Sequence, residues 1–477
     1  MRIAMITSEA APFIKTGGLG DVLQALPNEL SKLPNTEVAI FLPYYKSVKY
    51  NPSIKTKFLT SFTMNLTWRK QYVGLFQLKS RQRKLKVYFI DNEYYFCRDG
   101  IYGFGDDCER FAYFSKAVLA CMNWLVYKPE IIHCHDWQTA QVPVYLGAEF
   151  RSFFPRTKTI FTIHNVEYQG KMDMEFFNDV IGLNDYWRNV CSYDGCMNFM
   201  KAAIVQADLV TTVSETYAKE LRYPYFNHGL SGILWDKRDN IKGITNGIDV
   251  SVFDPATDPA LIKNFSAETY VDKLANKRAL QKELGLKESN APILAMVTRL
   301  ATHKGIDILC YILHRLLERN IQLVIVGTGE EKYERVLRSV ADKNRGKLSV
   351  NLRFDPALAS RVYGGSDIYL MPSKSEPCGL SQLISMHYGA IPVVNATGGL
   401  KDTVLPYDTK SRKGRGFTFQ NYNGDDFLDA IDRALELYYH DHDAWVALAK
   451  ADMAEDFSWR RPAKQYMKLY TSLLYTK

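Results

Sequence analysis

The chain has 477 residues, more than one ordinary hydrophobic core accommodates, so we expect at least two domains. Hydrophobic residues make up 47% and charged residues 23% of the sequence, which excludes a disordered or fibrous protein. The 60 Lys and Arg residues exceed the 52 Asp and Glu residues by only 8, and they are too scattered to form a nucleic-acid-binding stripe.

The cysteines and the N-terminal residues indicate in which cellular compartment the protein is expected. Eight cysteines are spread along the chain without the spacing of a disulfide scaffold. The N-terminus turns polar after Ile6 and lacks the apolar core of a signal peptide, and no stretch approaches a membrane span. We therefore expect a reduced, cytoplasmic protein with no membrane partner.

Short β-branched runs alternate with helical periods in the first half of the chain, a pattern typical of parallel sheets covered by helices. A stripe of apolar residues at helical spacing predicts a helix over Glu109–Leu125. Strands are predicted for the following runs: Arg2–Thr7, Glu37–Leu42, Lys86–Ile90, Glu130–His133, Thr159–His164 and Leu209–Val213.

The pattern then restarts, which predicts a second doubly wound α/β domain. Helices are predicted over Ile306–Arg319 and Gly379–Tyr388, and strands over Ile293–Thr298, Gln322–Val326, Ser349–Phe354, Ile368–Met371 and Pro392–Val394. Gly and Asn residues in Lys242–Asp249 favour a bend, so we divide the domains as 1–242 and 243–456. The tail 457–477 has apolar residues with which it could pack back on the first domain.

Ligands of such sheets bind at the carboxyl ends of the strands. The first such junction reads Lys15-Thr16-Gly17-Gly18-Leu19-Gly20-Asp21, where glycines let backbone N–H groups approach an anion. The order differs from a P-loop, in which Lys follows the glycines, and from a dinucleotide fingerprint, because Leu23 replaces the third glycine. A purely conformational role for these glycines stays open.

A second junction joins a predicted strand to a predicted helix at residues 371–382. Pro377 suits a helix start, and the amides of Cys378–Ser381 would then face a diphosphate. Glu376 is placed to accept hydrogen bonds from sugar hydroxyls, although an acid that merely complements the helix dipole is the alternative. Arg299 and Lys304 follow another strand and could neutralise a phosphate leaving group, or be ordinary surface cations.

Two histidine-containing segments also fall at predicted strand ends, His133-Cys134-His135-Asp136-Trp137 and Thr162-Ile163-His164-Asn165. The two histidines of the first segment are compatible with zinc, but no further ligand pair supports a zinc site, so we predict polar contacts and no metal. Asp441-His442-Asp443 matches the Asp-x-Asp pair of metal-dependent sugar transferases, yet it lies between two helical stretches, which favours helix-end solvation.

Taken together, these segments resemble bacterial glycogen synthases and plant starch synthases. The matching runs occur in family order over nearly the whole chain: residues 15–22, 133–137, 161–165 with 168–170, 244–249, Arg299-Leu300 with Lys304-Gly305, 376–380, and Thr397-Gly398-Gly399-Leu400. One glycine loop would be weak evidence, but a collinear set is specific.

The resemblance implies a glycosyltransferase-B fold, with two Rossmann-like domains facing a deep cleft. The N-terminal domain would hold the acceptor and the C-terminal domain the nucleotide sugar. It implies a retaining hexosyltransferase that moves glucose from ADP-glucose to the non-reducing end of an α-1,4-glucan such as glycogen, in glycogen biosynthesis, without metal or other cofactor.

The resemblance also implies roles for residues. Arg299 and Lys304 would stabilise the departing diphosphate, Glu376 would orient the donor glucose, and His164 would lie beside the anomeric carbon. Tyr363 would stack on adenine, and Asp136 with Trp137 would face the acceptor. Further substrate-binding residues implied are Lys15, Gly17, Gly18, Asp21, Asn165, Asn246, Cys378, Gly379, Leu380 and Ser381.

The sequence departs from the family at some positions, and other functions compete. Lys374-Ser375 stands where an aromatic or Arg-Phe pair is common, and Ser381 where Thr is frequent. The E-x7-E pattern of other retaining transferases fails at Ile384, so a same-face mechanism is favoured over a covalent intermediate. The alternatives are a catalytically silent glucan-binding protein and a pyridoxal-dependent glucan phosphorylase.

Overall fold

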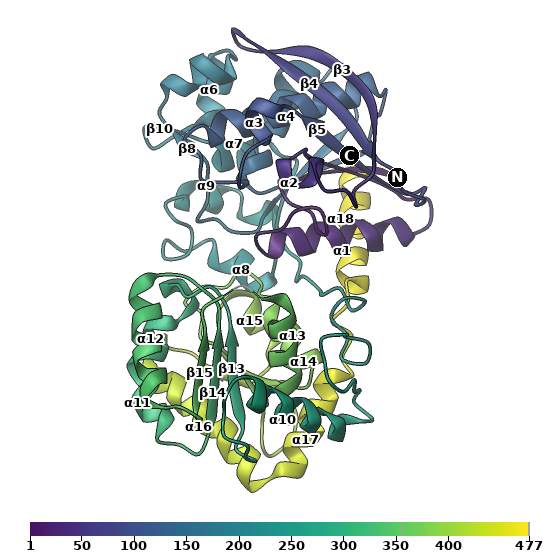
Figure 1. Cartoon of the computed structure of the whole chain (residues 1–477). Coiled ribbons are helices and arrows are strands. Elements are labelled where there is room, and N and C mark those ends of the chain that lie inside the picture. Colours follow the sequence, from purple (N-terminus) through teal and green to yellow (C-terminus); the bar gives the residue numbers. More distant parts are fainter. Residues whose placement is uncertain (354, 476–477) are drawn as a thin grey trace. The chain divides into compact units, whose positions relative to one another are not determined.

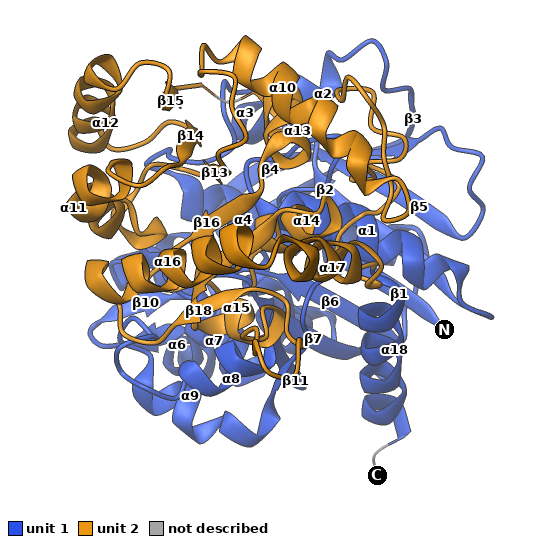
Figure 2. Ribbon diagram, turned by 90° about the horizontal axis from the view of Figure 1, so that it is seen from below, with its two compact units in different colours: residues 1–246, 459–477 blue, residues 247–458 orange. Residues whose placement is uncertain are grey.

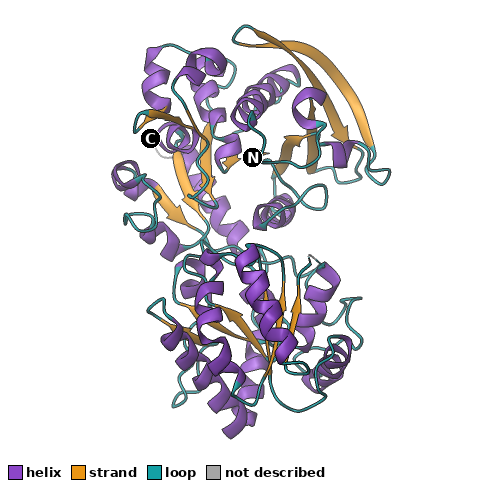
Figure 3. Cartoon of the chain, turned by 60° about the vertical axis from the view of Figure 1, so that its left-hand side comes forward, coloured by secondary structure: helices purple, strands orange, loops and turns teal. Residues whose placement is uncertain are grey.

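The computed structural model describes residues 1–353 and 355–475, which divide into two compact units (Figure 2). Unit 1 comprises Met1–Asn246 with Trp459–Lys477, and unit 2 comprises Gly247–Ser458. The divisions lie a few residues beyond the limits expected from the sequence, 242 and 456. Both units are doubly wound α/β domains with helices on the two faces of a sheet (Figure 3).

Among the described residues, unit 1 contains a nine-stranded sheet in the order β12-β11-β7-β6-β1-β2-β5-β4-β3. Strands β12 to β5 run parallel, and the β3–β4 hairpin adds an antiparallel edge. The strands are β1 (Arg2–Ile6), β2 (Glu37–Pro43), β3 (Thr56–Leu66), β4 (Arg69–Leu78), β5 (Leu85–Asp91), β6 (Ile131–His135), β7 (Lys158–Ile163), β11 (Leu209–Thr212) and β12 (Ile241–Gly243).

The predicted strands of the first half are all present, with ends that differ by one or two residues. The prediction ended β6 at His133, whereas the strand continues to His135. The β3–β4 hairpin was missed, because its turn uses Thr67 at φ 54° instead of the Asn-Gly or Asp-Gly pair that marks such turns. A small sheet of β8 (Lys171–Met172), β9 (Ser192–Tyr193) and β10 (Cys196–Asn198) was also missed.

Helices cover both faces of the unit 1 sheet (Figure 1). The predicted helix Glu109–Leu125 is α4 (Asp107–Trp124). The C-terminal α18 (Arg460–Tyr475) packs against α1 (Gly18–Lys32), with its Tyr470 buried in the core of unit 1. The other helices with regular α geometry are α2 (Lys46–Lys49), α3 (Glu93–Phe96), α5 (Gln141–Tyr145), α6 (Asp185–Cys191), α7 (Phe199–Gln206), α8 (Glu215–Glu220) and α9 (Ser231–Asp236).

Unit 2 has a parallel sheet, six-stranded over the described residues, in the order β15-β14-β13-β16-β17-β18. Its strands are β13 (Ile293–Val297), β14 (Gln322–Val326), β15 (Leu348–Asn351), β16 (Ile368–Met371), β17 (Ile391–Asn395) and β18 (Phe417–Phe419). All predicted strands of this half are present. The prediction carried β15 to Phe354, which lies outside the described residues.

Alternation along β13 divides the apolar residues of unit 2 between two cores. Leu294 and Met296 pack with α11 (Ile306–Leu317), α12 (Glu331–Lys343) and α16 (Gly424–His440). Ile293 and Ala295 face α10 (Lys273–Glu283), α13 (Pro356–Gly365) and α14 (Ser381–His387) on the other side (Figure 1). The remaining helices are α15 (Gly398–Thr403) and α17 (His442–Met453).

No helix in the described ranges, 1–353 and 355–475, has the length and apolar character needed to span a bilayer.

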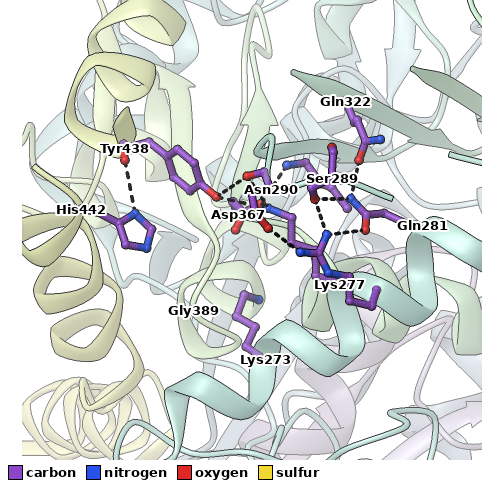
Figure 4. Close-up of polar contacts among 12 residues, drawn as sticks. Lys273, Lys277, Gln281, Ser289, Asn290, Gln322, Asp367, Gly389, Tyr438 and His442 are labelled. Atoms are coloured by element: carbon purple, nitrogen blue, oxygen red, sulfur yellow. Dashed lines mark hydrogen bonds and ion pairs between the residues drawn. The ribbon is translucent and has the colours of Figure 1, made fainter. Parts of the chain in front are cut away.

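A buried ammonium ties three helices of unit 2 together. Lys273 begins α10, and its Nζ donates to the carbonyl oxygens of Tyr363 (3.0 Å) and Gly364 (3.0 Å), at the end of α13, and of Tyr388 (2.7 Å), just after α14. A cation suits these helix ends, because their last carbonyls lack intrahelical partners. Burial lowers the pKa of Lys273 to about 7. One turn later, Lys277 pairs with Asp367 at 2.7 Å (Figure 4).

We expect Lys273→Met to lower the free energy of unfolding at pH 10 by about 2–3 kcal/mol, since it leaves three buried carbonyls without their donor. At lower pH the lowered pKa of Lys273 favours the unfolded state, so the difference between variant and wild type should shrink. Urea unfolding followed by circular dichroism measures the change. Lys282→Met is the matched control, because Lys282 is exposed in the last turn of the same helix. Equal midpoints for the two variants would show that the buried contacts contribute nothing.

Candidate active site

The order of strands locates a crevice in each sheet. In unit 1 the chain proceeds from β1 to β2 on one side and continues with β6 on the other. In unit 2 the same reversal separates β13 from β16. Connections diverge at such points, and ligands of open α/β sheets bind there, at the carboxyl ends of the strands. The predicted residues that follow β1, β6, β13 and β16 therefore lie at the sheet edges where ligands of this fold class bind.

A buried carboxylate organises the glycine-rich turn after β1. The Oε2 of Glu9 accepts hydrogen bonds from the backbone N–H groups of Thr16 (2.6 Å) and Gly17 (3.3 Å), and its Oε1 accepts from the Thr16 hydroxyl (2.7 Å). Tyr102 donates to the same Oε1 at 2.8 Å. Glu9 therefore fixes the turn that carries Lys15. The sequence analysis missed it, although an acid shortly after a buried strand was a usable signal.

Gly17 is not required by local geometry. Its φ of −156° is extended, and an added Cβ would meet nothing within 4 Å. A glycine at this position can still serve to let a ligand approach the backbone closely. Lys15 lies beside it, with Nζ 2.6 Å from the carboxylate of Asp21 on the first turn of α1.

Asp136 follows β6 in a strained conformation. Its φ of 58° and ψ of 177° are rarely adopted by a residue with a Cβ. The carboxylate accepts the backbone N–H of His164 at 2.8 Å, which joins the end of β6 to the end of β7. Burial raises the pKa of Asp136 to about 7, against the lowering effect of these amide hydrogen bonds.

The residues next to Asp136 and His164 in sequence make contacts with other residues of unit 1. Trp137 packs edge-to-face against Phe111 with ring centroids 5.3 Å apart. The Oδ1 of Asn165 accepts the backbone N–H of Glu167 at 3.0 Å and so closes the turn after β7. His164 is half-buried and lies against His135, with Nε2 of His164 3.0 Å from Nδ1 of His135.

In unit 2, Lys304 and Glu376 meet at the switch point between β13 and β16. Lys304 Nζ lies 2.6 Å from Glu376 Oε2, which also accepts the Ser373 hydroxyl at 3.1 Å. Only 9% of the Glu376 side chain and 20% of the Lys304 side chain are exposed. The exposed Arg299 follows β13 directly. The two cations predicted from the sequence thus lie on loops of the same sheet edge as Glu376.

Glycines at the start of α15 hold the segment after Glu376 in place. An added Cβ on Gly398, whose φ is +45°, would approach the carbonyl oxygen of Glu376 to 2.0 Å, and one on Gly399 would approach that of Cys378 to 2.3 Å. The N–H of Gly399 donates to the Glu376 carbonyl at 3.0 Å. Only glycine allows this contact, which explains the Thr397-Gly398-Gly399 motif in physical terms.

The helix predicted over Gly379–Tyr388 is shorter, since α14 begins at Ser381. Gly379 has a φ of 74°, a conformation that favours glycine, and Leu380 is the N-cap residue. The first intrahelical bond runs from the Ile384 N–H to the Leu380 carbonyl. The N–H groups of Leu380 and Ser381 thus precede that ladder, as the first amides of a helix do.

Tyr363 and Asn246, two further predicted residues, are also buried. Tyr363 is 5% exposed in the last turn of α13, with its ring centroid 5.3 Å from that of Tyr369. Asn246 is 7% exposed, and its Oδ1 is buried without a hydrogen-bond partner in the described structure. Adenine stacking by Tyr363 stays a prediction.

Metal-binding patterns find no support in the geometry. Over residues 1–353 and 355–475, no three His, Cys, Asp or Glu side chains are arranged to hold a metal ion. Asp441 caps α17, with its carboxylate accepting the Ala444 N–H at 3.1 Å. The predicted helix-end role of Asp441-His442-Asp443 is thereby confirmed.

Comparison with known proteins gives matches along nearly the whole chain. Residues 2–236 match the family described as starch synthase catalytic domain, and residues 277–450 match glycosyl transferases group 1. A glycogen synthase of Alkaliphilus metalliredigens is 44% identical over 99% of this chain and 100% of its own length. A glycogen synthase of Clostridium perfringens is 45% identical over 99% of this chain and 98% of its own length.

Solved structures agree with these sequence matches. The catalytic domain of starch synthase IV from Arabidopsis thaliana, bound to ADP and acarbose, superposes with a TM-score of 0.92, at 34% identity and 99% coverage of both chains. A sucrose-phosphate synthase from Thermosynechococcus elongatus shares the fold, with a TM-score of 0.62 at 18% identity over 99% of this chain and 98% of its own.

We expect Asp136→Asn to change how stability depends on pH. The folded-state pKa of about 7 exceeds the ordinary value of about 4, so the native protein binds the extra proton between these pH values. The free energy of unfolding therefore falls as pH rises through that window. Asn keeps the Oδ1 acceptor but cannot ionise. We expect the variant to match the wild type near pH 4 and to exceed it by up to about 4 kcal/mol at pH 8.

Urea unfolding at several pH values tests this expectation. Asp194→Asn is the matched control, because Asp194 also has a positive φ, 50°, but is exposed. The control should run parallel to the wild type. A difference between wild type and Asp136→Asn that is constant from pH 4 to pH 8 would contradict the assignment of this proton to Asp136.

Proposed function

The chain belongs to the family of bacterial glycogen synthases and plant starch synthases, and from that premise we propose that it extends an α-1,4-glucan with glucose from ADP-glucose. The transfer retains the configuration at the anomeric carbon and adds to the non-reducing end of the acceptor. The fold is glycosyltransferase-B. The product in the cell would be glycogen, and the enzyme a hexosyltransferase of glycogen biosynthesis.

The observation that carries the proposal is that Arg299, Lys304 and Glu376 lie on the loops after β13 and β16. Cations beside a diphosphate lower the energy of the charge that develops as the sugar departs. Arg299 is exposed and follows β13 directly, and Lys304 already lies at 2.6 Å from an anionic oxygen. We assign both to the departing ADP, and we assign the N–H groups of residues 378–381 to its phosphates.

Glu376 is assigned to the donor sugar. Its carboxylate is nearly enclosed and is held by Lys304 and Ser373, so its oxygens have fixed positions from which to accept hydrogen bonds from sugar hydroxyls. In unit 1, Lys15, Gly17 and Gly18 are assigned to donor binding, and Asp136 to the acceptor.

The leaving phosphate can accept the proton of the attacking hydroxyl on the same face. The bond between the anomeric carbon and the ADP oxygen breaks as the acceptor oxygen bonds to that carbon. The acceptor's proton passes to the released phosphate oxygen, so no carboxylate nucleophile is needed. Ile384, at the second position of the E-x7-E pattern, supports this route over a covalent intermediate.

A cytoplasmic location is part of the proposal. Its support is that none of the eight cysteines forms a disulfide in the described structure, which suits a reducing compartment.

A donor panel tests the proposed reaction. We expect transfer of labelled glucose into glycogen from ADP-glucose, with a kcat/KM at least tenfold above that for UDP-glucose. A preference for UDP-glucose would overturn the donor. Glucan binding without transfer from any nucleotide sugar would instead favour a silent binding protein, and glucose 1-phosphate release from glycogen and phosphate would favour phosphorolysis.

Arg299→Met should lower kcat/KM for ADP-glucose by about 100-fold or more, the effect of removing one preorganised charge-stabilising donor. This variant leaves the Lys304–Glu376 ion pair intact, so its effect reports on Arg299 alone. Lys343→Met, which removes an exposed cation of α12, is the control. Near-normal rates for Arg299→Met would remove its assigned role.

Glu376→Gln should lower kcat far more than it weakens ADP-glucose binding.

A further inference from the structure

Three histidines form a continuous cluster inside unit 1. His133 and His135 share one face of β6, and their ring centroids lie 4.1 Å apart. His164, just after β7, extends the cluster through the 3.0 Å contact between its Nε2 and Nδ1 of His135. His135 thus lies between a fully buried ring and the half-buried ring assigned to the reaction.

His133 is held on both sides. Its Nδ1 lies 2.8 Å from the hydroxyl of Tyr470 on α18, and its Nε2 lies 2.5 Å from the Thr162 hydroxyl on β7. The Thr162 hydroxyl in turn lies 2.6 Å from that of Thr211 on β11. The ring of His133 is therefore a fixed surface against which His135 packs.

The protons of His135 and His164 can be counted. Burial lowers the pKa of His164 to about 3 and that of His135 well below its ordinary value, so both imidazoles are neutral at pH 7 and carry one N–H each. The contact between them needs one proton. Either His135 donates from Nδ1 to His164 Nε2, or His164 donates from Nε2 to His135 Nδ1.

The other nitrogen of His135 decides between these arrangements. Its Nε2 is buried and has no hydrogen-bond partner within the described structure. If His164 were the donor, this Nε2 would carry a buried N–H without an acceptor, and orphaned buried donors are rarer than orphaned acceptors. The proton therefore belongs on Nδ1 of His135. His164 then accepts at Nε2 and carries its own proton on Nδ1.

We propose that His135 is a positioning residue that fixes His164 in the Nδ1–H tautomer, so that His164 donates a hydrogen bond from Nδ1 to an oxygen of the bound sugar. Nδ1 of His164 has no hydrogen-bond partner in the described parts of the chain, so it is available to a ligand. The substrate in this inference rests on the function proposed above.

A packing role alone makes a different prediction. Neighbouring imidazoles can fill a core whichever nitrogen carries the proton, and a side chain of similar size would then serve as well as His135. The proposal instead requires a donor at the position of Nδ1. The two readings therefore separate in the tautomer of His164 and in the response to substitutions that keep or remove that donor.

The tautomer can be measured on the ligand-free full chain. Two-bond proton–nitrogen correlation spectra of 15N-histidine-labelled protein distinguish the two neutral forms, and the chain has only 9 histidines to assign. The signals of His164 and His135 are identified by their loss in His164→Asn and His135→Asn. We expect His164 to show a protonated Nδ1 at pH 7. A protonated Nε2 would overturn the proposal.

Activity gives the second measurement. His135→Asn can place its side-chain N–H near the position of Nδ1, whereas His135→Leu has no donor. We expect His135→Leu to lower kcat about tenfold relative to His135→Asn, with the dissociation constant of ADP unchanged within twofold in both. His314→Leu makes the same substitution at an exposed histidine of α11 and should match the wild type.

The outcomes separate this inference from the proposed function. Equal kcat values for folded His135→Asn and His135→Leu, checked by circular dichroism and urea midpoints, would show that His135 acts by packing alone. If the wild type transferred glucose from no nucleotide sugar, the proposed function would fail, while the tautomer measurement would still decide the role of His135. A fold lost in His135→Leu leaves that measurement on the wild type intact.

Discussion

Reversal of strand order is the constraint on which the candidate site depends. In each unit the connections leave neighbouring parallel strands in opposite directions, β1 from β6 and β13 from β16, so the carboxyl edge is left open between them. The loops that follow these strands carry Lys15, Asp136, Arg299 and Glu376, and the loop after the adjacent β7 carries His164. The topology therefore places these polar side chains at one edge of each sheet, independently of the conformation of each loop.

Loops of this kind must also satisfy their backbone polar groups without a sheet or helix ladder. In unit 1 two carboxylates do so, Glu9 for the glycine-rich turn and Asp136 for the turn after β7. In unit 2 close backbone contact does so, with Gly398 and Gly399 against the segment from Glu376 to Cys378. Both devices make the loops rigid, which is what an enzyme needs to hold donors and charges before the substrate arrives.

Sequence patterns predicted the parts of this arrangement that follow from local physics. Buried parallel strands are apolar runs, so β7 and β16 were found, and their ends located His164 and Glu376. The β3–β4 hairpin was missed because Thr67 makes its turn. Glu9 was missed because the amides and hydroxyls that it accepts from come together only in the folded turn. His135 and His164 are 29 residues apart in sequence, and no local sequence pattern predicts that their side chains are in contact.

Electrostatics explains why different groups are assigned to the leaving diphosphate and to the anomeric carbon of the sugar. Cationic Arg299 and Lys304 suit a diphosphate that gains negative charge as the bond breaks. The sugar left behind gains positive charge at its anomeric carbon, and a cation within a few ångströms of it would oppose the reaction. His164 is assigned to that side, and burial against His135 lowers its pKa to about 3. A neutral imidazole donates a hydrogen bond without adding charge. In the proposed reaction the histidine cluster thus supplies orientation where a lysine or arginine would raise the barrier.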